Sequence, residues 1–464
     1  MRMKTPTSNR NAIVHGSLTT SVLGRRWRQP ELIKVTDRVY SATGYAISNV
    51  LYIITDNSLV VIDTTESPQA ARASFDEFRK ISELPVSHII YTHFHGDHIR
   101  GARVFYTAGT KIIAQKRMLD ELARLEAFLP YRRRADSVQF GAALDVEERG
   151  ISLACYPIKG HAPRYVNHNS QHRFNAAGYV PPDTIFDNEY RFEEGGVAFE
   201  LYHTLGETSD HLMVWLPEEK VLFPGDLFYR SFPMLSNPLK PDRPVLAWIE
   251  SLGRMRALRP TYLVPSHGKP MSGVDDVDAA LANYAEAIRH VHDETVKLIN
   301  QGVSVEEIRG QVHLPARLAR LPYLKQRYGT VRWAVNGIFR HYTGWYHTFN
   351  PTDLRPSPRR ALYQAILEAT GGIEPLLRRS QKALEEGQNQ IALELADIVL
   401  GVKPRTPRAR LVRLQALTRL GRKAENVVEQ NIYRTAARTL GAELSSSRLT
   451  LPRGPGAARA SVGR

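Results

Sequence analysis

The chain has 464 residues, of which 42% are hydrophobic and 23% are charged. This length and composition allow a large buried core over two or three domains, and they exclude disorder throughout the chain. No apolar run reaches the roughly 18 residues that a membrane-spanning helix needs, so we expect no membrane span. The single cysteine, Cys155, excludes an internal disulfide framework and any metal site built from cysteine alone.

The formal net charge of +15 is concentrated at the two ends of the chain. Residues 1–34 carry +6 and residues 401–464 carry +11, which leaves −2 on residues 35–400. Basic tails can bind nucleic acid or anionic lipid. The nearly neutral body argues against a channel that follows a phosphate backbone, so we do not expect nucleic acid as a partner. Residues 12–24 are too polar for the apolar part of a signal peptide, which favours a cytoplasmic location.

The first half of the chain alternates between strand-like and helix-like patterns. Two β-branched and aromatic runs, 49–55 and 58–63, flank an Asp-Asn turn and predict a β-hairpin. Further elements are expected in this order: a helix over 67–84 and strands over 86–91, 151–156, 220–224 and 261–265. Alternation of this kind is typical of a layered α/β domain.

The second half is helical throughout. We expect a long helix over 275–301 and shorter helices over 305–312 and 323–343. From 359 to 441, helices of about 15 residues separated by glycine or proline favour stacked helical pairs of the TPR type. Turns are expected at 371–372, 387, 401–404 and 421.

Four segments follow from these patterns. They are a flexible basic lead-in (1–32), an α/β catalytic domain (33–272), a helical domain (273–444) and a disordered basic tail (445–464).

The motif that carries chemistry is His93-Phe94-His95-Gly96-Asp97-His98, which directly follows the apolar strand expected at 86–91. Four ligand-type side chains within six residues at a strand end can surround metal ions. Imidazole and carboxylate groups are standard ligands for zinc and related metals. The motif therefore predicts a metal site.

Three more candidate ligands follow other strand-like runs. Glu207, Asp226 and His267 each lie beside a glycine, which allows the backbone to approach an ion closely. His211 remains an alternative to Glu207, and we expect His203 to be a hydrogen-bonded strand residue. Together, four neutral imidazoles and three carboxylates would leave two divalent ions with a small positive charge, suited to an anionic substrate.

These motifs, in this order, resemble the metallo-β-lactamase fold, an αβ/βα sandwich with its metal site at the sheet edges. Most of that superfamily has histidine at the third-ligand turn, whereas Leu205-Gly206-Glu207 is similar to the alkyl sulfatase branch. The stretches 290–302, 328–329, 342–345 and 369–372 resemble the alkyl sulfatase dimerisation domain. The resemblance covers residues 33–441.

The resemblance implies a role for each motif residue. One metal ion would be held by His93, His95 and Glu207, and the other by Asp97, His98 and His267. Asp226 would bridge the two ions, and Asp63 would orient a ligand from behind. Two Zn²⁺ ions are expected, with iron or manganese as alternatives.

The same resemblance implies a hydrolase that uses a metal-bound water or hydroxide, with Asp97 and Asp226 as catalytic residues. The pKa of that water would fall from about 15.7 towards about 7. An alkyl sulfate is the expected small-molecule ester substrate, and the helical domain implies a homodimer. Other hydrolases of this fold, a thioesterase or lactonase, remain alternatives, and a nucleic-acid-processing hydrolase is a more distant one.

Substrate-binding residues are less clearly marked. The bridging position reads Asp226-Leu227 instead of the Glu-Asn that is usual in the large sulfatases, and the expected sulfate-binding arginine is missing from its place. Lys240 or Arg243 would have to substitute, although a lysine does not bind an oxyanion in the bidentate manner of an arginine. The polar segment 161–172 is a further candidate for a substrate loop.

Overall fold

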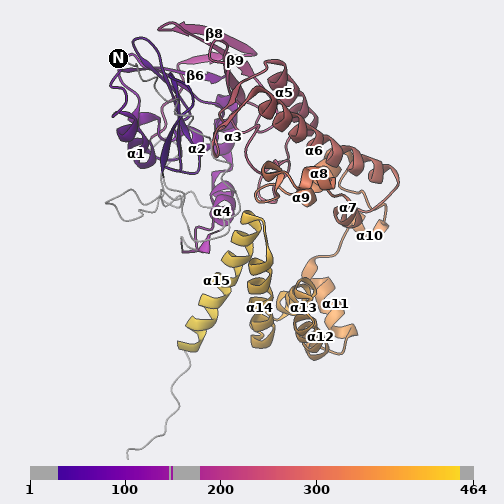
Figure 1. The fold of residues 1–464 in the computed structure, drawn as a ribbon. Helices are drawn as coiled ribbons and strands as arrows, with labels where there is room; N and C mark the ends of the chain where they lie inside the picture. The colour runs from indigo at the N-terminus through magenta and orange to yellow at the C-terminus, as the bar shows by residue number, and fades with distance from the viewer. Residues whose placement is uncertain (1–29, 146–147, 150–177, 450–464) are drawn as a thin grey trace, which may run out of the picture.

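The computed structural model describes residues 30–145, 148–149 and 178–449. Several expectations therefore lie outside the described residues: the lead-in up to residue 29, the strand over 151–156 that contains Cys155, the polar segment 161–172, and the tail beyond residue 449. Figure 1 shows a layered α/β part with flanking helices, below which lies a bundle formed by the last five helices.

The first sheet contains seven strands in chain order from β1 to β7. Strands β1 to β4 pair antiparallel, and the β4–β5, β5–β6 and β6–β7 pairs are parallel. The hairpin expected over 49–63 is confirmed as the antiparallel pair β3–β4. The strands are β1 (Glu31–Lys34), β2 (Val39–Thr43), β3 (Val50–Ile54), β4 (Leu59–Ile62), β5 (Val86–Ile90), β6 (Lys111–Gln115) and β7 (Thr184–Phe186).

The second sheet contains six strands in the order β13-β12-β11-β10-β9-β8. All its pairs are antiparallel except β11–β12, which is parallel. The strands are β8 (Glu189–Glu194), β9 (Val197–His203), β10 (Leu212–Leu216), β11 (Val221–Phe223), β12 (Tyr262–Leu263) and β13 (Met271–Ser272).

The period-two alternation of the strands divides their side chains between separate cores. Leu51 and Ile53 of β3 point between the two sheets, where they share a core with Val214 and Leu216 of β10. Their neighbours Val50 and Tyr52 point outward into a core beneath the helix α1. Because both faces of the inner strands β3, β4 and β10 are buried, these strands read as nearly continuous apolar runs.

Helices cover the outer faces of both sheets, which confirms the expected αβ/βα sandwich (Figure 1). In the first layer, the ring of Tyr52 stacks on Phe78 of α1 with centroids 4.1 Å apart. The helices and 3₁₀ turns of this part are α1 (Pro68–Phe78), α2 (Gly96–Ile99), η1 (Ala102–Val104), α3 (Arg117–Ala127), α4 (Leu129–Gln139) and α5 (Val245–Ala257).

Helix α1 is shorter than the sequence pattern predicts. It starts after Ser67, whose Oγ accepts a hydrogen bond from the Ala70 amide at 3.2 Å, with proline at its first position. It ends at Phe78 because the chain then turns to bring Pro85 beside β4, where the Pro85 carbonyl accepts from the Leu59 amide.

The helices after residue 273 begin by completing the sandwich. They are α6 (Val274–Asn300), α7 (Val305–Gln311), α8 (Ala316–Ala319), η3 (Pro322–Leu324), α9 (Val331–Tyr342) and α10 (Pro351–Leu354). Tyr284 of α6 and Val335 of α9 share one hydrophobic core with Trp248 of α5 and Met213 of β10. The domain boundary expected at residue 272 therefore falls inside this core.

The helix expected over 323–343 forms only in its second part. Thr330 caps α9 by accepting from the Trp333 amide at 3.1 Å. Residues 325–329 instead run against the loop that follows β11, where the Phe232 amide donates to the Lys325 carbonyl at 3.0 Å. A tertiary contact has replaced local helical hydrogen bonds in this segment.

The last five helices form a separate bundle with its own apolar cores. They are α11 (Arg359–Ala369), α12 (Ile373–Glu385), α13 (Asn389–Val402), α14 (Pro407–Lys423) and α15 (Val427–Leu449). The turn expected at Gly421 is wrong: α14 continues to Lys423, and a β-carbon at Gly421 would lie 3.2 Å from the Cβ of Tyr433. Helix α15 also continues through residues 445–449, which we had assigned to the tail.

Helix α15 connects the bundle to the catalytic half, because its first turns pack against α4 (Figure 1). Within the described residues, no helix has both the length and the apolar character needed to cross a membrane.

Candidate metal centre

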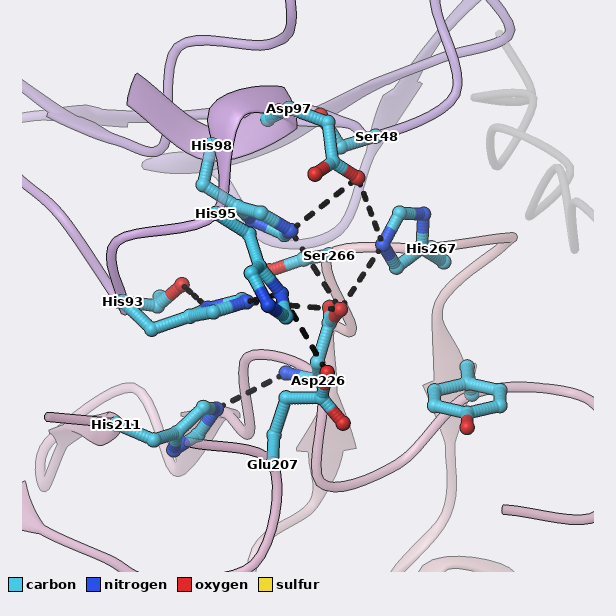
Figure 2. A network of polar contacts seen from close by, with 12 residues as sticks. Ser48, His93, His95, Asp97, His98, Glu207, His211, Asp226, Ser266 and His267 are labelled. Atoms are coloured by element: carbon cyan, nitrogen blue, oxygen red, sulfur yellow. Dashed lines mark hydrogen bonds and ion pairs between the residues drawn. The ribbon is translucent and has the colours of Figure 1, made fainter. Parts of the chain in front are cut away.

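The candidate ligands come from four strand ends that the fold brings to one place (Figure 2). The His93–His98 motif follows β5 and ends in the short helix α2. Glu207 follows β9, Asp226 follows β11 and His267 follows β12. All seven predicted ligand residues lie in this one cluster.

The seven residues divide into two groups. One ligand atom from each of His93, His95, Glu207 and Asp226 lies within 4.8 Å of the others, and these four residues are buried. One ligand atom from each of Asp97, His98 and His267 meets the same criterion.

Asp226 lies between the two groups (Figure 2). Its Oδ2 is 3.8 Å from His93 Nε2 in the first group. The same oxygen is 3.5 Å from His98 Nε2 and 3.2 Å from His267 Nε2 in the second group. A single carboxylate thus faces both sets of imidazoles.

The cluster fits divalent metal ions. His98 Nε2 and Asp226 Oδ1 are buried and have no hydrogen-bond partner among the residues that the structure describes. Buried polar atoms are normally paired, and one without a partner calls for an explanation such as an ion. Imidazole nitrogens and carboxylate oxygens in tetrahedral or slightly larger sets are the ligands that zinc and its neighbours prefer.

Asp63 fixes the orientation of the motif from behind. It is fully buried at the end of β4, with a backbone φ of 58°. Its Oδ1 accepts from the Thr92 amide at 2.9 Å, and its Oδ2 accepts from His98 Nδ1 at 2.7 Å and from Ser266 Oγ at 2.8 Å. Because Nδ1 of His98 is taken by the Asp63 carboxylate, Nε2 is the ring nitrogen that would bind a metal ion.

His93 and His267 are held in the same manner. His93 Nδ1 lies 3.1 Å from Thr92 Oγ1, and that hydroxyl donates its own hydrogen to Asp63. His267 Nδ1 donates to the Ile47 carbonyl at 2.8 Å. In each case Nδ1 is occupied by a backing contact and Nε2 faces the cluster.

His211 and His203 do not belong to either ligand group. His211 Nδ1 donates to Thr204 Oγ1 at 2.9 Å, and its Nε2 accepts from the Asp226 amide at 3.1 Å. Burial lowers the pKa of His211 to about 3, so the ring stays neutral and able to accept. His203 Nε2 bonds to the Ser209 carbonyl at 2.8 Å, as expected for a hydrogen-bonded strand residue.

The His211 contact explains the glycine before Asp226. Gly225 has a φ of +55°, and a β-carbon there would lie 2.4 Å from His211 Nε2. Only glycine adopts this conformation without strain while leaving room for the imidazole. The role of His211 as a backbone support for Asp226 had no signal in the sequence.

The carboxylates of the cluster differ in their electrostatics: burial raises the pKa of Glu207, whereas neighbouring imidazoles lower that of Asp226. Burial by itself raises the pKa of Asp226, but the neighbouring His267 and His98 outweigh this effect and hold the pKa well below its usual range. Burial likewise lowers the pKa of His267, but Asp226 raises it to about 9. Asp226 is therefore ionised and paired with protonated imidazole, and a bound cation would take the place of that imidazole proton.

Cationic side chains surround the His95 side of the cluster. Arg243 forms a bidentate pair with Glu207, with Nε 3.1 Å from Oε2 and Nη2 in contact with Oε1. Burial lowers the pKa of His95 well below its usual range, and the positive charges of Lys240, Arg243 and Arg132 lower it further. Arg132, on α4, is a part of this cationic environment that the sequence did not indicate.

The α/β part of the chain matches the metallo-β-lactamase superfamily over residues 43–267. The helical part matches the alkyl sulfatase dimerisation family over residues 304–443. Together with the strand-end cluster, these matches define the class: a metallo-β-lactamase-fold protein with a candidate metal centre and an alkyl-sulfatase-type helical region.

Comparison with individual relatives places the chain in a particular family within this class. The chain is 30% identical over 399 residues to a linear primary-alkylsulfatase from Pseudomonas sp. (strain ATCC 19151), covering 83% of this chain and 72% of the relative. It is 27% identical to an (R)-specific secondary-alkylsulfatase from Pseudomonas sp., covering 89% of this chain and 64% of the relative. The chain belongs to the alkylsulfatase family.

Solved structures agree with this placement. The stereoselective inverting sec-alkylsulfatase Pisa1 from Pseudomonas sp. superimposes with a TM-score of 0.78 at 26% identity. The superposition covers 89% of this chain and 65% of that protein. The chain thus spans slightly less than two thirds of the length of both secondary-alkylsulfatase relatives.

Proposed function

We propose that this protein is a dinuclear metal-dependent hydrolase of alkyl sulfate esters. The observation that carries the proposal is the pair of donor groups that share Asp226, in a chain that belongs to the alkylsulfatase family. Each group supplies enough imidazole and carboxylate atoms to bind one divalent ion when Asp226 is counted in both.

The proposed ligands follow the two groups. His93, His95 and Glu207 would hold one ion, Asp97, His98 and His267 would hold the other, and Asp226 would contribute to both. Zinc is the proposed metal, and iron and manganese suit the same donor atoms. Two divalent ions bound here would lower the pKa of an attacking water to about 7 and neutralise charge on the ester.

Other residues of the chain orient the proposed ligands, and two of the carboxylates are suited to handle a proton. Asp63 keeps His98 in the tautomer that presents Nε2, and His211 holds the backbone of Asp226 in place. Asp97 and Asp226 are the carboxylates closest to both His98 and His267, so they are suited to accept a proton or orient the water. These positions supply the pre-organised geometry on which such hydrolysis depends.

The cations near His95 favour an anionic head group on that side. Arg243 is largely buried, with 9% of its side chain exposed, and its guanidinium already bonds Glu207. Burial lowers the pKa of Lys240 to about 8, with Arg132 as the next cause, so its charge is sensitive to an added anion. We propose that the sulfate lies between these side chains and the two ions, because charge-assisted bonds to an anion are strongest where water is excluded.

The helical region supports a homodimer as the proposed assembly. It matches the alkyl sulfatase dimerisation family. Trp345 and Phe349, between α9 and α10, expose 75% and 81% of their surface, which is unusual for aromatic side chains outside an interface. We place the functional division of the chain at residues 272–273, although the α6–α9 helices share a core with the second sheet.

Two measurements on the purified protein test the proposal. Metal content per chain is determined by elemental analysis, and sulfate release is followed with dodecyl sulfate as substrate. Two metal ions per chain together with sulfate release support the proposal. Two ions without sulfate release would refute the sulfatase assignment and favour a carboxylic ester or thioester substrate, while a protein without metal would refute the centre itself.

A further inference from the structure

Tyr328 lies beside the candidate metal centre although it comes from the segment before α9. Its ring meets Tyr229 edge to face with centroids 5.9 Å apart, and Tyr229 meets His267 edge to face at 6.4 Å. Burial raises the pKa of Tyr328, and the charges of Glu207 and Asp97 raise it further. Tyr229 thus links the ring of Tyr328 to His267 of the candidate centre.

The backbone around Tyr328 is attached to the loop that follows Asp226. The Tyr328 amide donates to Ser231 Oγ at 3.1 Å, and the Gly329 amide donates to the Phe232 carbonyl at 3.2 Å. Movement of residues 328–329 would therefore displace the loop that follows Asp226.

A directed chain of hydrogen bonds ends at the Tyr328 hydroxyl. The Leu239 amide can only donate, and it does so to Asn237 Oδ1 at 2.7 Å. Asn237 Nδ2 therefore donates to Gln139 Oε1 at 3.2 Å, and Gln139 Nε2 donates to Tyr328 Oη at 3.3 Å. Since the phenolic oxygen is an acceptor in this chain, its hydrogen is left to donate elsewhere. No acceptor for that hydrogen is found within residues 30–145, 148–149 and 178–449.

The start of α15 holds both Gln139 and Tyr328, the last two residues of this hydrogen-bonded chain. Asn426 caps the helix, because its Oδ1 accepts from the Val428 and Glu429 amides at 2.9 and 3.0 Å. Its Nδ2 donates to the Tyr328 carbonyl at 2.7 Å. The fully buried Asn431 donates from Nδ2 to the Gln139 carbonyl at 2.8 Å.

Apolar contacts complete the junction. Val427 and Val428 share a small buried cluster with Met234, which lies in the segment 227–235 after Asp226 (the site loop), and the ring of Tyr328 packs against this cluster. The first residues of α15 therefore contact Tyr328 and the site loop, and Asn431 contacts the end of α4.

We infer that Asn426 and Asn431 are positioning residues that use the C-terminal bundle to hold Tyr328 as a hydrogen-bond donor toward the substrate in the metal centre. The inference rests on the proposed function for its substrate, while the attachment of Tyr328 to α15 stands on the contacts alone. On this inference the C-terminal helical bundle helps to position a substrate-binding residue, in addition to any role in dimer assembly.

The chain offers a substitution that separates capping from positioning. Asn426→Asp keeps an oxygen for the cap and places charge favourably at a helix N-terminus, but it replaces the donor to the Tyr328 carbonyl with an acceptor. Arg438→Ala is the matched control. It removes exposed ion pairs to Asp145 and Glu148 at the same α15–α4 junction without touching Tyr328 or Asn426.

The first experiment is a double-mutant cycle in the full chain. Asn426→Asp and Tyr328→Phe should each lower kcat/KM for dodecyl sulfate by about tenfold, the value of one hydrogen bond to a charged group. The double variant should lose little more than either single one, because Asn426 acts through Tyr328. Metal content and Tm should stay close to wild type, and Arg438→Ala should retain full kcat/KM.

Three results would overturn the inference: full kcat/KM in Asn426→Asp, additive losses in the double variant, or a loss that follows metal content and Tm. Amide hydrogen exchange distinguishes failure of this inference from failure of the proposed function. If the wild type releases no sulfate, the sulfatase assignment fails. The attachment is then decided by exchange at residues 328–329, which should be faster in Asn426→Asp than in Arg438→Ala, and equal rates would refute it.

Discussion

Replacing Asp63 with asparagine is the sharpest test of how the centre is organised. Asparagine has the same shape and also tolerates the positive φ of 58° at this position, so the backbone is preserved. The substitution changes only the donor and acceptor pattern behind His98 and Ser266. If the remaining oxygen stays on the Thr92 amide at the Oδ1 position, the new NH₂ group faces His98 Nδ1, now 2.7 Å from Oδ2.

An NH₂ group in that place donates to Nδ1 and favours the other tautomer of His98. The ring would then carry its hydrogen on Nε2 and point it at the centre, where a lone pair is required. Loss of a backing carboxylate of this type lowers metal affinity by about 10- to 100-fold. Any donor left unpaired in this fully buried position costs about 1–3 kcal/mol of stability.

The assay is competition with a calibrated chelator, followed by elemental analysis of the metal that remains bound. We expect Asp63→Asn to lose the ion of the Asp97, His98 and His267 group first. Asp56→Asn is the matched control, since Asp56 is 66% exposed and pairs with Arg38 at the surface. Unchanged affinity for both ions in Asp63→Asn would refute the tautomer argument.

Four further predictions follow from the same geometry. Gly225→Ala places a β-carbon 2.4 Å from His211 Nε2 and should lower stability by about 1–3 kcal/mol together with metal content, as measured by denaturation and elemental analysis. Glu207→Ala should lose chiefly one ion, whereas Asp226→Ala should lose both and all turnover; retention of two ions by either variant would contradict the ligand assignment. Removing metal with a chelator should lower Tm, because metal at 100 times its Kd stabilises the folded state by about 2.7 kcal/mol. Burial raises the pKa of Glu66 to about 7, so the folded state binds a proton that the unfolded state has released, and stability should fall as pH rises from about 4.5 to 7. Glu66→Gln should flatten that part of the stability profile in thermal melts between pH 5 and 8, and an unchanged slope would show that Glu66 is not its cause.

The candidate ligand residues could be predicted from sequence because each of them lies in a local pattern. His93, His95, Asp97 and His98 directly follow an apolar run that could only be a buried strand. Glu207, Asp226 and His267 follow other such runs beside glycine. Since strands of a sandwich end at common edges, strand-end residues with ligand chemistry are brought together by the architecture itself.

The contacts that organise the site were not accessible in this way. Asp63 bonds Ser266 across 203 positions of sequence, and Asn431 bonds Gln139 across 292. Partners at such separations are chosen by how the sheets and helices close on one another, and no periodicity records that choice. The same reason explains why residues 325–329 left the expected helix to pair with the site loop.

The alternation of strands and helices, the two-part organisation and the candidate metal-binding motif could all be predicted from sequence, because hydrophobic period and ligand spacing are local properties. Three contacts come from the tertiary structure alone: His211 supports a backbone amide, Arg243 pairs with Glu207, and Asn426 before α15 bonds the Tyr328 carbonyl. These depend on which buried donors meet which acceptors, and that is settled only when the whole core is packed.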